Sequence, residues 1–491
     1  MNAAHGIAPA EAALPFAEAI GQFRAAHAAA ATFTVRNPAT GARLADVPDL
    51  GRMEAGHAID LARKAFTGWA ARTAKERCAL LRGWHRLILD RQEELARLLT
   101  LEQGKPLAEA RAEILYGLTF IEWFAEEARR VYGDIIPTHA ADKRLLVLKQ
   151  PVGVVGAITP WNFPNAMVTR KVAPALAAGC TIVLKPAEET PLSAIALHAL
   201  ALEAGIPAGV VNLVTTSRPG DIGEVLTASH DVRKLSFTGS TEVGRLLMRQ
   251  CADTIKKLSL ELGGNAPFIV FDDADMDAAV AGAIAAKFRN SGQTCVSANR
   301  ILVQSRVYAA FAERFRSAVA TLEVGDGMAP GTGVGPLINA AAVDKVERLV
   351  RDAVARGAKI VQGGARHALG GNFYQPTVLT DVRPDMAITG QEIFGPVAPL
   401  MVFDTDREAI HLANDTRYGL VSYFYAQDMS RIWRVAEALE CGIVVLNSAT
   451  FSSEATPFGG VKESGIGREG SKYGLDEYVE IKYFCMGGLQ G

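Results

Sequence analysis

Hydrophobic residues recur at helical spacing through the first third of the chain. Between residues 54 and 127, apolar side chains such as Leu81, Trp84 and Ile88 follow one another at intervals of three or four, with charged residues between them. This spacing gathers the apolar side chains on one face and so predicts amphipathic helices packed against a core. Gly104, followed two positions later by a proline, predicts a break between two of these helices.

After Lys149 the pattern changes to short apolar runs separated by helical stretches. The predicted strands are Val152–Ile158, Thr181–Leu184, Val210–Val214 and Lys234–Thr238. The predicted helices between them are Ala166–Ala178, Pro191–Ala204 and Asp221–Ala228. This alternation predicts an α/β fold with a doubly wound parallel sheet. Such a sheet commonly binds a dinucleotide at the carboxyl ends of its strands.

A second alternating series begins near Pro267. Its predicted strands are Pro267–Phe271, Ile301–Val303, Leu400–Phe403 and Ile443–Leu446. This series predicts a second α/β domain. The last apolar alternation, Tyr478–Cys485, predicts a terminal strand that pairs either with another subunit or at an edge of its own domain.

Composition limits the classes of function. The chain has 491 residues, of which 49% are hydrophobic and 21% are charged, and its net charge is −2. That length predicts two or three domains. The balanced charge gives no basis for binding nucleic acid or an anionic membrane, and no apolar run reaches the roughly 20 residues of a transmembrane helix. Residues 1–32 are expected to form a loosely held extension with a helical tendency.

The six cysteines are scattered singly, with no Cys-x-x-Cys pair and no cluster with histidine. This distribution predicts neither a disulfide framework nor a metal site, and it favours a reducing, cytoplasmic location. Single cysteines are usually small core residues. A functional role for any one of them therefore needs support from its surroundings.

Three segments carry reactive or polar side chains in unusual surroundings. Cys295 follows the polar, glycine-containing stretch Asn290-Ser-Gly-Gln-Thr, which can give a thiolate the access it needs. Glu261 lies among leucines and glycines, where a carboxylate is costly to bury unless it is paired or functional. Asn162 lies in a turn fixed by two prolines, as an aimed side-chain amide requires. Each segment alone has an ordinary alternative, namely a core cysteine, an ion-paired strand end or a rigid turn.

A fourth segment, Phe237-Thr-Gly-Ser-Thr-Glu-Val-Gly, lies where a predicted strand meets a helix. Its glycines allow a pyrophosphate to approach the backbone at the helix N-terminus. The segment does not match the Gly-x-Gly-x-x-Gly pattern, so by itself it has low specificity.

Together these segments resemble the aldehyde dehydrogenase superfamily. The strings that carry the resemblance, in the order and spacing of that family, are Pro160-Trp-Asn-Phe-Pro, Phe237-Thr-Gly-Ser, Glu261-Leu-Gly-Gly, Gly292-Gln-Thr-Cys and Glu392-Ile-Phe-Gly-Pro. The resemblance covers the chain from Phe33 to Gly487. It implies a Rossmann-type parallel-sheet cofactor domain (33–130 and 150–264), a second α/β catalytic domain (265–470), and a small β arm (131–149 and 471–491) for homo-oligomerisation into dimers or tetramers.

The resemblance also implies a mechanism. Cys295 would attack the aldehyde carbon, and the oxyanion of the thiohemiacetal would be held by the Asn162 side-chain amide and the Cys295 N–H. Hydride transfer would leave a thioester, which water activated by Glu261 would hydrolyse. Lys171 would join a proton relay or help to organise Asn162.

The same resemblance implies a nicotinamide cofactor and the residues that bind it. These residues are Thr159, Pro160, Trp161, Lys185, Glu188, Gly220, Gly239, Ser240, Leu262, Glu392 and Phe394. A carboxylate at Glu188 would accept hydrogen bonds from the adenosine ribose and repel a 2′-phosphate, so NAD is expected in preference to NADP.

Residues 102–110, 120–128 and 465–478 resemble the succinate-semialdehyde dehydrogenases in particular. For that subfamily the resemblance implies that arginines bind the far carboxylate of the substrate in a bidentate manner. The matching positions are Arg170 and Arg289, accompanied by Ser453 or its neighbour Ser452.

Other activities remain open at this point. The loop 450–456 differs from the usual subfamily sequence, so glutarate semialdehyde, 2-oxoglutarate semialdehyde and aromatic aldehydes are alternative substrates. A thioesterase or esterase that uses the same cysteine and glutamate without hydride transfer is a further alternative. A non-enzymic scaffold is disfavoured because Cys295, Glu261 and Asn162 are all present.

Overall fold

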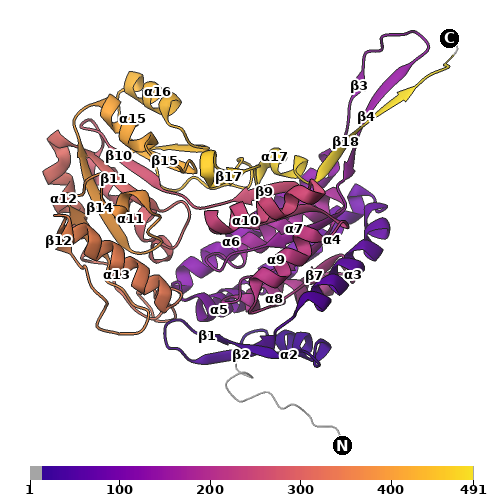
Figure 1. Cartoon of the computed structure of the whole chain (residues 1–491), viewed down its shortest axis with the longest axis horizontal. Coiled ribbons are helices and arrows are strands. Elements are labelled where there is room, and N and C mark those ends of the chain that lie inside the picture. The colour runs from indigo at the N-terminus through magenta and orange to yellow at the C-terminus, as the bar shows by residue number, and fades with distance from the viewer. Residues whose placement is uncertain (1–13, 490–491) are drawn as a thin grey trace, which may run out of the picture.

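The computed structural model describes residues 14–489 as two lobes and a protruding arm (Figure 1). Residues 1–13 of the predicted N-terminal extension and residues 490–491 lie outside the described part of the chain. Within residues 14–489, no helix is long and apolar enough to cross a membrane.

A six-stranded sheet organises the first lobe, with the strand order β17-β9-β8-β5-β6-β7. Its strands are β5 (Val154–Ile158), β6 (Thr181–Lys185), β7 (Val211–Leu213), β8 (Val232–Thr238), β9 (Lys257–Glu261) and β17 (Gly465–Ile466). All neighbours are parallel except β17, which runs antiparallel to β9 although it falls in the stretch expected in the second domain. The strand order reverses between β5 and β8, and open α/β sheets bind ligands outside the carboxyl ends of the strands at such a point.

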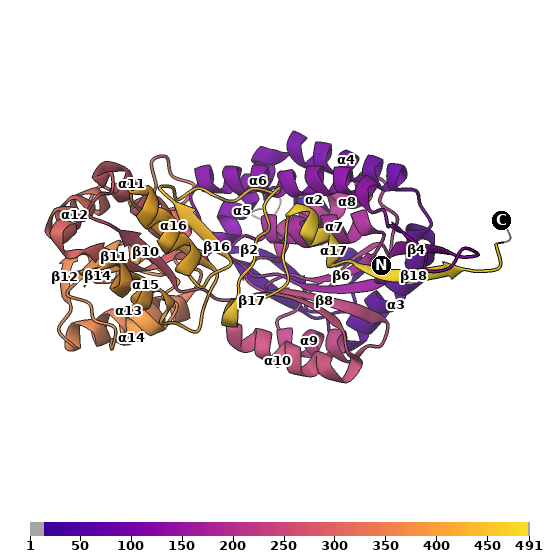
Figure 2. The ribbon, with the colours of Figure 1, turned by 90° about the horizontal axis from the view of Figure 1, so that it is seen from above.

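Helices cover both faces of this sheet (Figure 2). One face carries α3 (Arg52–Ala70), α9 (Pro219–Ala228) and α10 (Thr241–Cys251), and the other carries α7 (Ala166–Ala178) and α8 (Pro191–Glu203), with α4 (Ala74–Asp90), α5 (Gln92–Gln103) and α6 (Leu107–Glu127) outside them. Every residue of β5 and β6 is consequently buried. That double burial is why these strands are continuous apolar runs. The elements predicted here are confirmed, with small shifts at their ends.

The helical run breaks where the sequence predicts it. Gly104 ends α5 in the left-handed conformation, with φ +93°. A Cβ at this position would lie 2.7 Å from Pro336 Cγ and 2.9 Å from Pro38 Cγ, so only glycine fits. The turn therefore joins the helices of the first lobe to a loop of the second lobe and to the loop that contains Pro38.

A seven-stranded sheet organises the second lobe, with the order β12-β13-β14-β11-β10-β15-β16. Its strands are β10 (Ala266–Val270), β11 (Ala298–Gln304), β12 (Lys359–Gln362), β13 (Thr377–Thr380), β14 (Val397–Phe403), β15 (Val421–Tyr425) and β16 (Ile443–Leu446). All neighbours are parallel except β12 and β13. The second alternating series and the α/β fold class are thus confirmed.

Two apolar cores pack on this second sheet. One includes side chains of α11 (Met276–Phe288) and α12 (Ser305–Val319). The other includes side chains of α13 (Ala340–Ala355), α14 (Ala387–Gly390), α15 (Asp406–Asn414) and α16 (Met429–Ala438). The sheet is therefore covered on both faces, like the first.

The arm is an antiparallel sheet of β3 (Ile135–Ile136), β4 (Arg144–Pro151) and β18 (Val479–Met486), with β4 in the centre. The predicted C-terminal strand therefore pairs with a segment of its own chain, from Val479 opposite Pro151 to Met486 opposite Arg144. One part of the expected arm differs. Ser471–Asp476 forms helix α17, which packs against α6 and α7 in the first lobe.

The described part of the N-terminal extension is packed. Ala17–Ala26 forms helix α2, which contacts α8 and β2 and buries Ile20. A hairpin of β1 (Thr32–Arg36) and β2 (Arg43–Pro48), which the sequence pattern did not predict, follows it. The expectation of a loosely held segment is therefore wrong for residues 14–32, because apolar positions of α2 find a surface on α8.

Candidate active site

The carboxyl edge of the first sheet faces the amino edge of the second. Glu261 is the last residue of β9, whereas Gly264 and Cys295 lie just before β10 and β11. These edges approach so closely that a Cβ on Gly264 would lie 2.2 Å from the Cys295 carbonyl oxygen. A cavity of about 570 Å³ is lined by residues of both edges.

This cavity gathers most of the residues that the sequence assigns to the site. Those that line it are Pro160, Trp161, Asn162, Arg170, Gly239, Ser240, Glu261, Leu262, Arg289, Cys295, Glu392 and Phe394. Those outside its lining are Thr159, Lys171, Lys185, Glu188, Gly220 and Ser453. Ser452 lines the cavity, while the Ser453 hydroxyl bonds Glu454 at 3.3 Å. The structure therefore favours Ser452 over Ser453 as the serine that faces a substrate.

The loop before Cys295 has an unusual backbone. Asn290 and Ser291 have φ values of 50° and 57°, in the left-handed region, and Gly292 follows with 75°. A Cβ on Gly292 would lie 2.2 Å from the Gly395 carbonyl oxygen, so glycine is required there. Left-handed non-glycine residues cost about 1–3 kcal/mol each and persist only where their surroundings enforce them, commonly at functional sites.

Asn162 reaches this loop from the first lobe. Its side-chain Nδ2 donates to the Gln293 carbonyl at 3.1 Å, and its own carbonyl accepts from Asn290 Nδ2 at 3.0 Å. A primary amide has two N–H groups, so the bond to Gln293 fixes the amide and leaves the second N–H for a substrate oxygen. Asn162 and Cys295 line the same cavity, as the expected oxyanion role requires.

The surroundings hold the Cys295 thiol in its neutral form. Burial raises the pKa of this thiol to about 12, the charges of Glu392 and Glu261 add to the rise, and Arg170 and Arg289 oppose it. The thiolate and not the thiol is the nucleophile. Attack therefore needs a base that takes the proton.

Glu261 has the properties of such a base. It is 4% exposed, and within residues 14–489 neither of its carboxyl oxygens has a hydrogen-bond partner. Burial raises the pKa of Glu261 well above its ordinary range, and the charge of Glu469 adds to that rise. A carboxyl with a raised pKa holds a proton more tightly, as a general base near neutral pH requires.

Glu469 belongs to the site, although sequence reasoning did not single it out. It lies between β17 and α17, lines the cavity, and pairs through Oε2 with Arg170 Nε at 2.8 Å and through Oε1 with Lys171. Burial favours a raised pKa for Glu469, but Lys171 and Arg170 outweigh burial and lower it. A carboxylate in a glycine-rich stretch is the signal that could have found it, since Glu469 lies in Gly467-Arg-Glu-Gly470.

Lys171 contacts Glu469 and Ser236. Its Nζ bonds Ser236 Oγ at 3.1 Å and Glu469 Oε1. No bond joins Lys171 to Asn162 in the described structure. These contacts favour a place in a proton relay for Lys171 over the alternative of organising Asn162, and both roles stay predictions.

The two expected substrate arginines have different surroundings. Arg170 is 2% exposed, pairs with Glu469, and lies 4.0 Å from the ring centre of Phe458. Arg289 forms no ion pair with any residue of 14–489, and its guanidinium lies 5.5 Å from the ring centre of Phe163. Arg289 therefore brings to the cavity a cation without an ion-pair partner in the described structure, whereas Arg170 is paired with Glu469.

The nicotinamide end of the expected cofactor site lies in the same cavity. The rings of Trp161 and Phe394 meet edge to face, with centres 5.5 Å apart. Glu392 accepts a hydrogen bond from the Gly264 N–H at 2.9 Å, and burial raises the pKa of this carboxyl to about 7. Aromatic side chains and a carboxylate in one cavity suit a flat ring joined to a ribose.

The remaining cofactor residues continue along the sheet edge. Lys185, the last residue of β6, bonds Glu188 at 2.9 Å, and the Thr159 N–H, after β5, donates to the Lys185 carbonyl. Gly239 lies just before α10, whose N-terminus can bind a pyrophosphate. Gly220 lies in α9, beside α10 (Figure 2), with open space where a Cβ would be. This donor set fits a dinucleotide.

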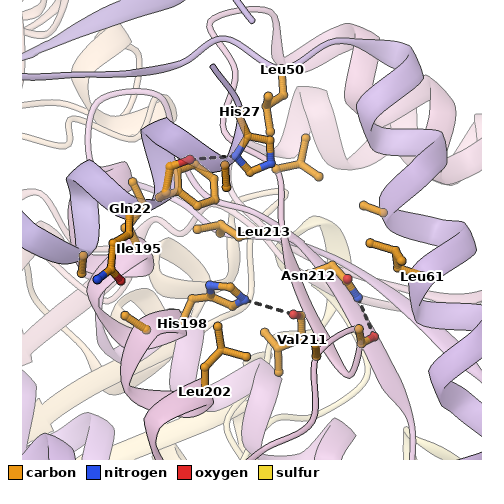
Figure 3. Close-up of a pocket in the computed structure, with 18 of the residues that line it drawn as sticks. Gln22, His27, Leu50, Leu61, Ile195, His198, Leu202, Val211, Asn212 and Leu213 are labelled. Atoms are coloured by element: carbon orange, nitrogen blue, oxygen red, sulfur yellow. Dashed lines mark hydrogen bonds between the residues drawn. The ribbon is translucent and has the colours of Figure 1, made fainter. Parts of the chain in front are cut away.

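A larger cavity, of about 930 Å³, lies beneath α2 and away from this chemistry. Residues of α2, α3 and α8 line it (Figure 3). Three of its polar side chains bond the backbone around them: His27 bonds the Phe23 carbonyl, His198 bonds the Val211 carbonyl, and Asn212 donates to a neighbouring carbonyl. The smaller cavity, with its unpaired titratable groups, is therefore the candidate active site.

Comparisons with known proteins agree with this geometry. The model of the aldehyde dehydrogenase family matches residues 24–484. The NADP(+) succinate-semialdehyde dehydrogenase of Escherichia coli (strain K12) is 60% identical over 453 residues, which cover 92% of this chain and 94% of that protein. The glutarate-semialdehyde dehydrogenase of Pseudomonas aeruginosa is 58% identical over 458 residues, which cover 93% and 95%.

The fold agrees as closely as the sequence. The crystal structure of succinate-semialdehyde dehydrogenase from Burkholderia pseudomallei has a TM-score of 0.92 and 59% identity, over 93% of this chain and 95% of that one. The likeness therefore extends over nearly the whole molecule and is not confined to the residues around Cys295. On this ground the chain belongs to the aldehyde dehydrogenase family.

Proposed function

We propose that the protein oxidises succinate semialdehyde to succinate with NAD(P)⁺. The observation that carries the proposal is the convergence of the Cys295 thiol, the Asn162 amide and the Glu261 carboxyl on one cavity that Arg289 also lines. The relatives named for succinate and glutarate semialdehyde support it, because both of those aldehydes end in a carboxylate.

Cys295 forms the covalent bond to the substrate. Glu261 takes the thiol proton, the sulfur attacks the aldehyde carbon, and the oxyanion is held by the Asn162 amide and the Cys295 N–H. Each aimed donor of this kind contributes about 3–4 kcal/mol. When bound, NAD(P)⁺ accepts the hydride that leaves this carbon, so that Cys295 carries a thioester.

Glu261 also completes the turnover. Once it has released the thiol proton to solvent, it takes a proton from water, the water oxygen attacks the thioester carbon, and the Cys295 sulfur leaves as the carboxylic acid forms. Glu469 supports both steps through its charge, because a nearby carboxylate raises the pKa of Glu261 and strengthens it as a base.

Arg289 gives the cavity its selectivity for an anionic substrate. A guanidinium without an ion-pair partner in the described structure gains a charge-assisted bond when a carboxylate arrives. Arg170 and Ser452 complete this end of the cavity. Glutarate semialdehyde and 2-oxoglutarate semialdehyde have the same terminal group and are the next candidates, while Phe451 and Phe458 on the wall keep aromatic aldehydes on the list.

We propose NAD as the preferred cofactor. The Glu188 carboxylate, beside Lys185 at the end of β6, would repel a 2′-phosphate. The Escherichia coli relative is named for NADP(+), so both cofactors occur among similar proteins and the choice depends on local charge. A cytoplasmic location is proposed from the cysteines, all of which are free among the described residues.

Cys295→Ala is expected to lower kcat by at least about 10³, because the covalent route is lost, and Glu261→Gln to lower it by about 10²–10⁴. The absorbance of reduced nicotinamide measures both. Cys441→Ala, a half-buried cysteine outside the cavity, is the matched control and should keep full activity. Thioester hydrolysis without cofactor reduction would instead identify a thioesterase.

Arg289→Ala is expected to lower kcat/KM for succinate semialdehyde about 10- to 100-fold, because a charge-assisted bond is lost. Butanal has the same chain length without the carboxylate, so its kcat/KM should change by less than about threefold. Arg314→Ala, at an exposed ion pair with Asp277, serves as the control. An equal loss with both aldehydes would contradict the role of Arg289.

Glu188→Gln is expected to raise kcat/KM for NADP relative to NAD by about tenfold, because the repelling charge is removed while the shape is kept. Steady-state rates with each cofactor measure the ratio. Glu203→Gln, which removes a partly exposed carboxylate from the end of α8, should leave it unchanged. An unchanged ratio in Glu188→Gln would overturn the assignment.

We propose that the arm joins subunits into a dimer or tetramer. β18 is an edge strand on which Ile481, Tyr483 and Phe484 are 73%, 57% and 45% exposed. The double variant Ile481→Asp, Phe484→Asp is expected to shift sedimentation velocity to a smaller species, because charged residues block apolar and strand contacts. Leu369→Asp, an exposed leucine in a loop outside the arm, is the control.

A further inference from the structure

The buried segment Glu102–Pro106 connects α5 to α6 but does not line the active-site cavity. Every one of its residues is buried, including a carboxylate, an amide and an ammonium. Buried polar groups are costly unless they are satisfied. Their partners therefore indicate what the segment does.

Lys105 holds the backbone of Asn162. Its Nζ donates to the Asn162 carbonyl at 2.8 Å and to Glu113 Oε2 at 2.5 Å, and it lies 3.9 Å from the ring centre of Phe163. The side chain of Lys105 is 0% exposed. The ammonium thus fixes the residue whose amide faces Cys295.

Glu113 fixes the other end of the same turn. Its second oxygen, Oε1, accepts from the N–H groups of Asn165 and Ala166, at 2.9 and 3.2 Å, where α7 begins. A carboxylate at a helix N-terminus satisfies donors that have no partner within the helix. The Lys105–Glu113 pair therefore clamps the turn from Asn162 to the start of α7 at both ends.

Gln103 connects the same turn to the loop of the nucleophile. Its Nε2 donates to Asn290 Oδ1 at 3.0 Å, and its Oε1 accepts from the Lys105 N–H at 2.9 Å. Asn290 in turn donates through Nδ2 to the carbonyls of Asn162 and Gln293, at 3.0 and 3.2 Å. The left-handed Asn290 is thus held by the segment and by Asn162 together.

We propose that Lys105, supported by Gln103, is a positioning residue for Asn162. By holding the Asn162 backbone, it sets the direction of the side-chain amide that serves as the oxyanion donor. The inference rests on the proposed oxyanion role of Asn162. The ammonium fixes the Asn162 carbonyl, the bond to Gln293 fixes its amide, and together they aim the remaining N–H into the cavity. An apolar side chain of equal volume would fill the space but leave this carbonyl with the bond from Asn290 Nδ2 and without the one from Lys105.

The test is a double-mutant cycle between Lys105 and Asn162. Lys105→Met keeps the volume and removes the charge, and it is expected to lower kcat at least about tenfold with little change in cofactor affinity. In the Asn162→Ala background the same change should cost less than about threefold, because the donor it aims is already gone. Lys105→Arg, which keeps a buried donor, should recover part of the rate.

Two variants separate positioning from loss of fold. Lys256 is also buried and bonds the carbonyls of Ser229 and Val232, away from the cavity, so Lys256→Met should keep kcat per folded molecule. Circular dichroism gives the folded fraction. If Lys105→Met does not fold, Gln103→Leu replaces it in the same cycle, with the same expected non-additivity.

The outcomes are distinct. Equal loss from Lys105→Met with and without Asn162 would overturn the inference, as would a kcat within about twofold of the parent. If Asn162→Ala alone left kcat unchanged, the proposed oxyanion role would fail and the inference with it. A large loss of kcat in Asn162→Ala combined with none in Lys105→Met would overturn the inference and leave the oxyanion role of Asn162 intact.

Discussion

The hydrogen bond from the Asn162 amide to the Gln293 carbonyl crosses from one lobe to the other beside the nucleophile. It joins a turn at the carboxyl edge of the first sheet to a left-handed loop at the amino edge of the second. A shift of either lobe would change the length of this bond and, with it, the position of the Asn162 amide relative to Cys295. The two sheets, their helices and the turn at Gly104 therefore serve one requirement, which is a constant distance between an amide and a thiol.

Burial sets the chemistry of the cavity as strongly as geometry does. It raises the pKa of Cys295, Glu261 and Glu392 together, so each of these groups holds a proton more tightly than it would in water. Glu469 is the exception, because two cations compensate it.

Much of the fold followed from the sequence because its elements have strong local patterns. β5 and β6 are uninterrupted apolar runs, and α7 spans Ala166–Ala178 as predicted, followed by Gly179 in the left-handed conformation. The packing of α2 and the pairing of β17 with β9 were missed, since each depends on a surface supplied by a distant part of the chain.

The site was predictable to a similar degree. Cys295, Glu261 and Asn162 stand in distinctive strings, whereas Glu469 becomes a site residue only when β17 folds back onto the first sheet. The sequence left Ser453 and Ser452 as alternatives for a simpler reason. Adjacent loop residues point in different directions, and the pattern contains no periodicity that would tell Ser452 from Ser453.

The position of Glu469 has a consequence for the order in which the molecule is made. Arg170 and Lys171 are synthesised almost three hundred residues before Glu469, the carboxylate with which they pair. Strand β4 is likewise synthesised long before β18, its partner in the arm. A nascent chain can build most of the first sheet and still have two uncompensated cations in its interior. A chain that ends before Glu469 would contain every motif around Cys295, but Arg170 and Lys171 would lack the carboxylate with which they pair.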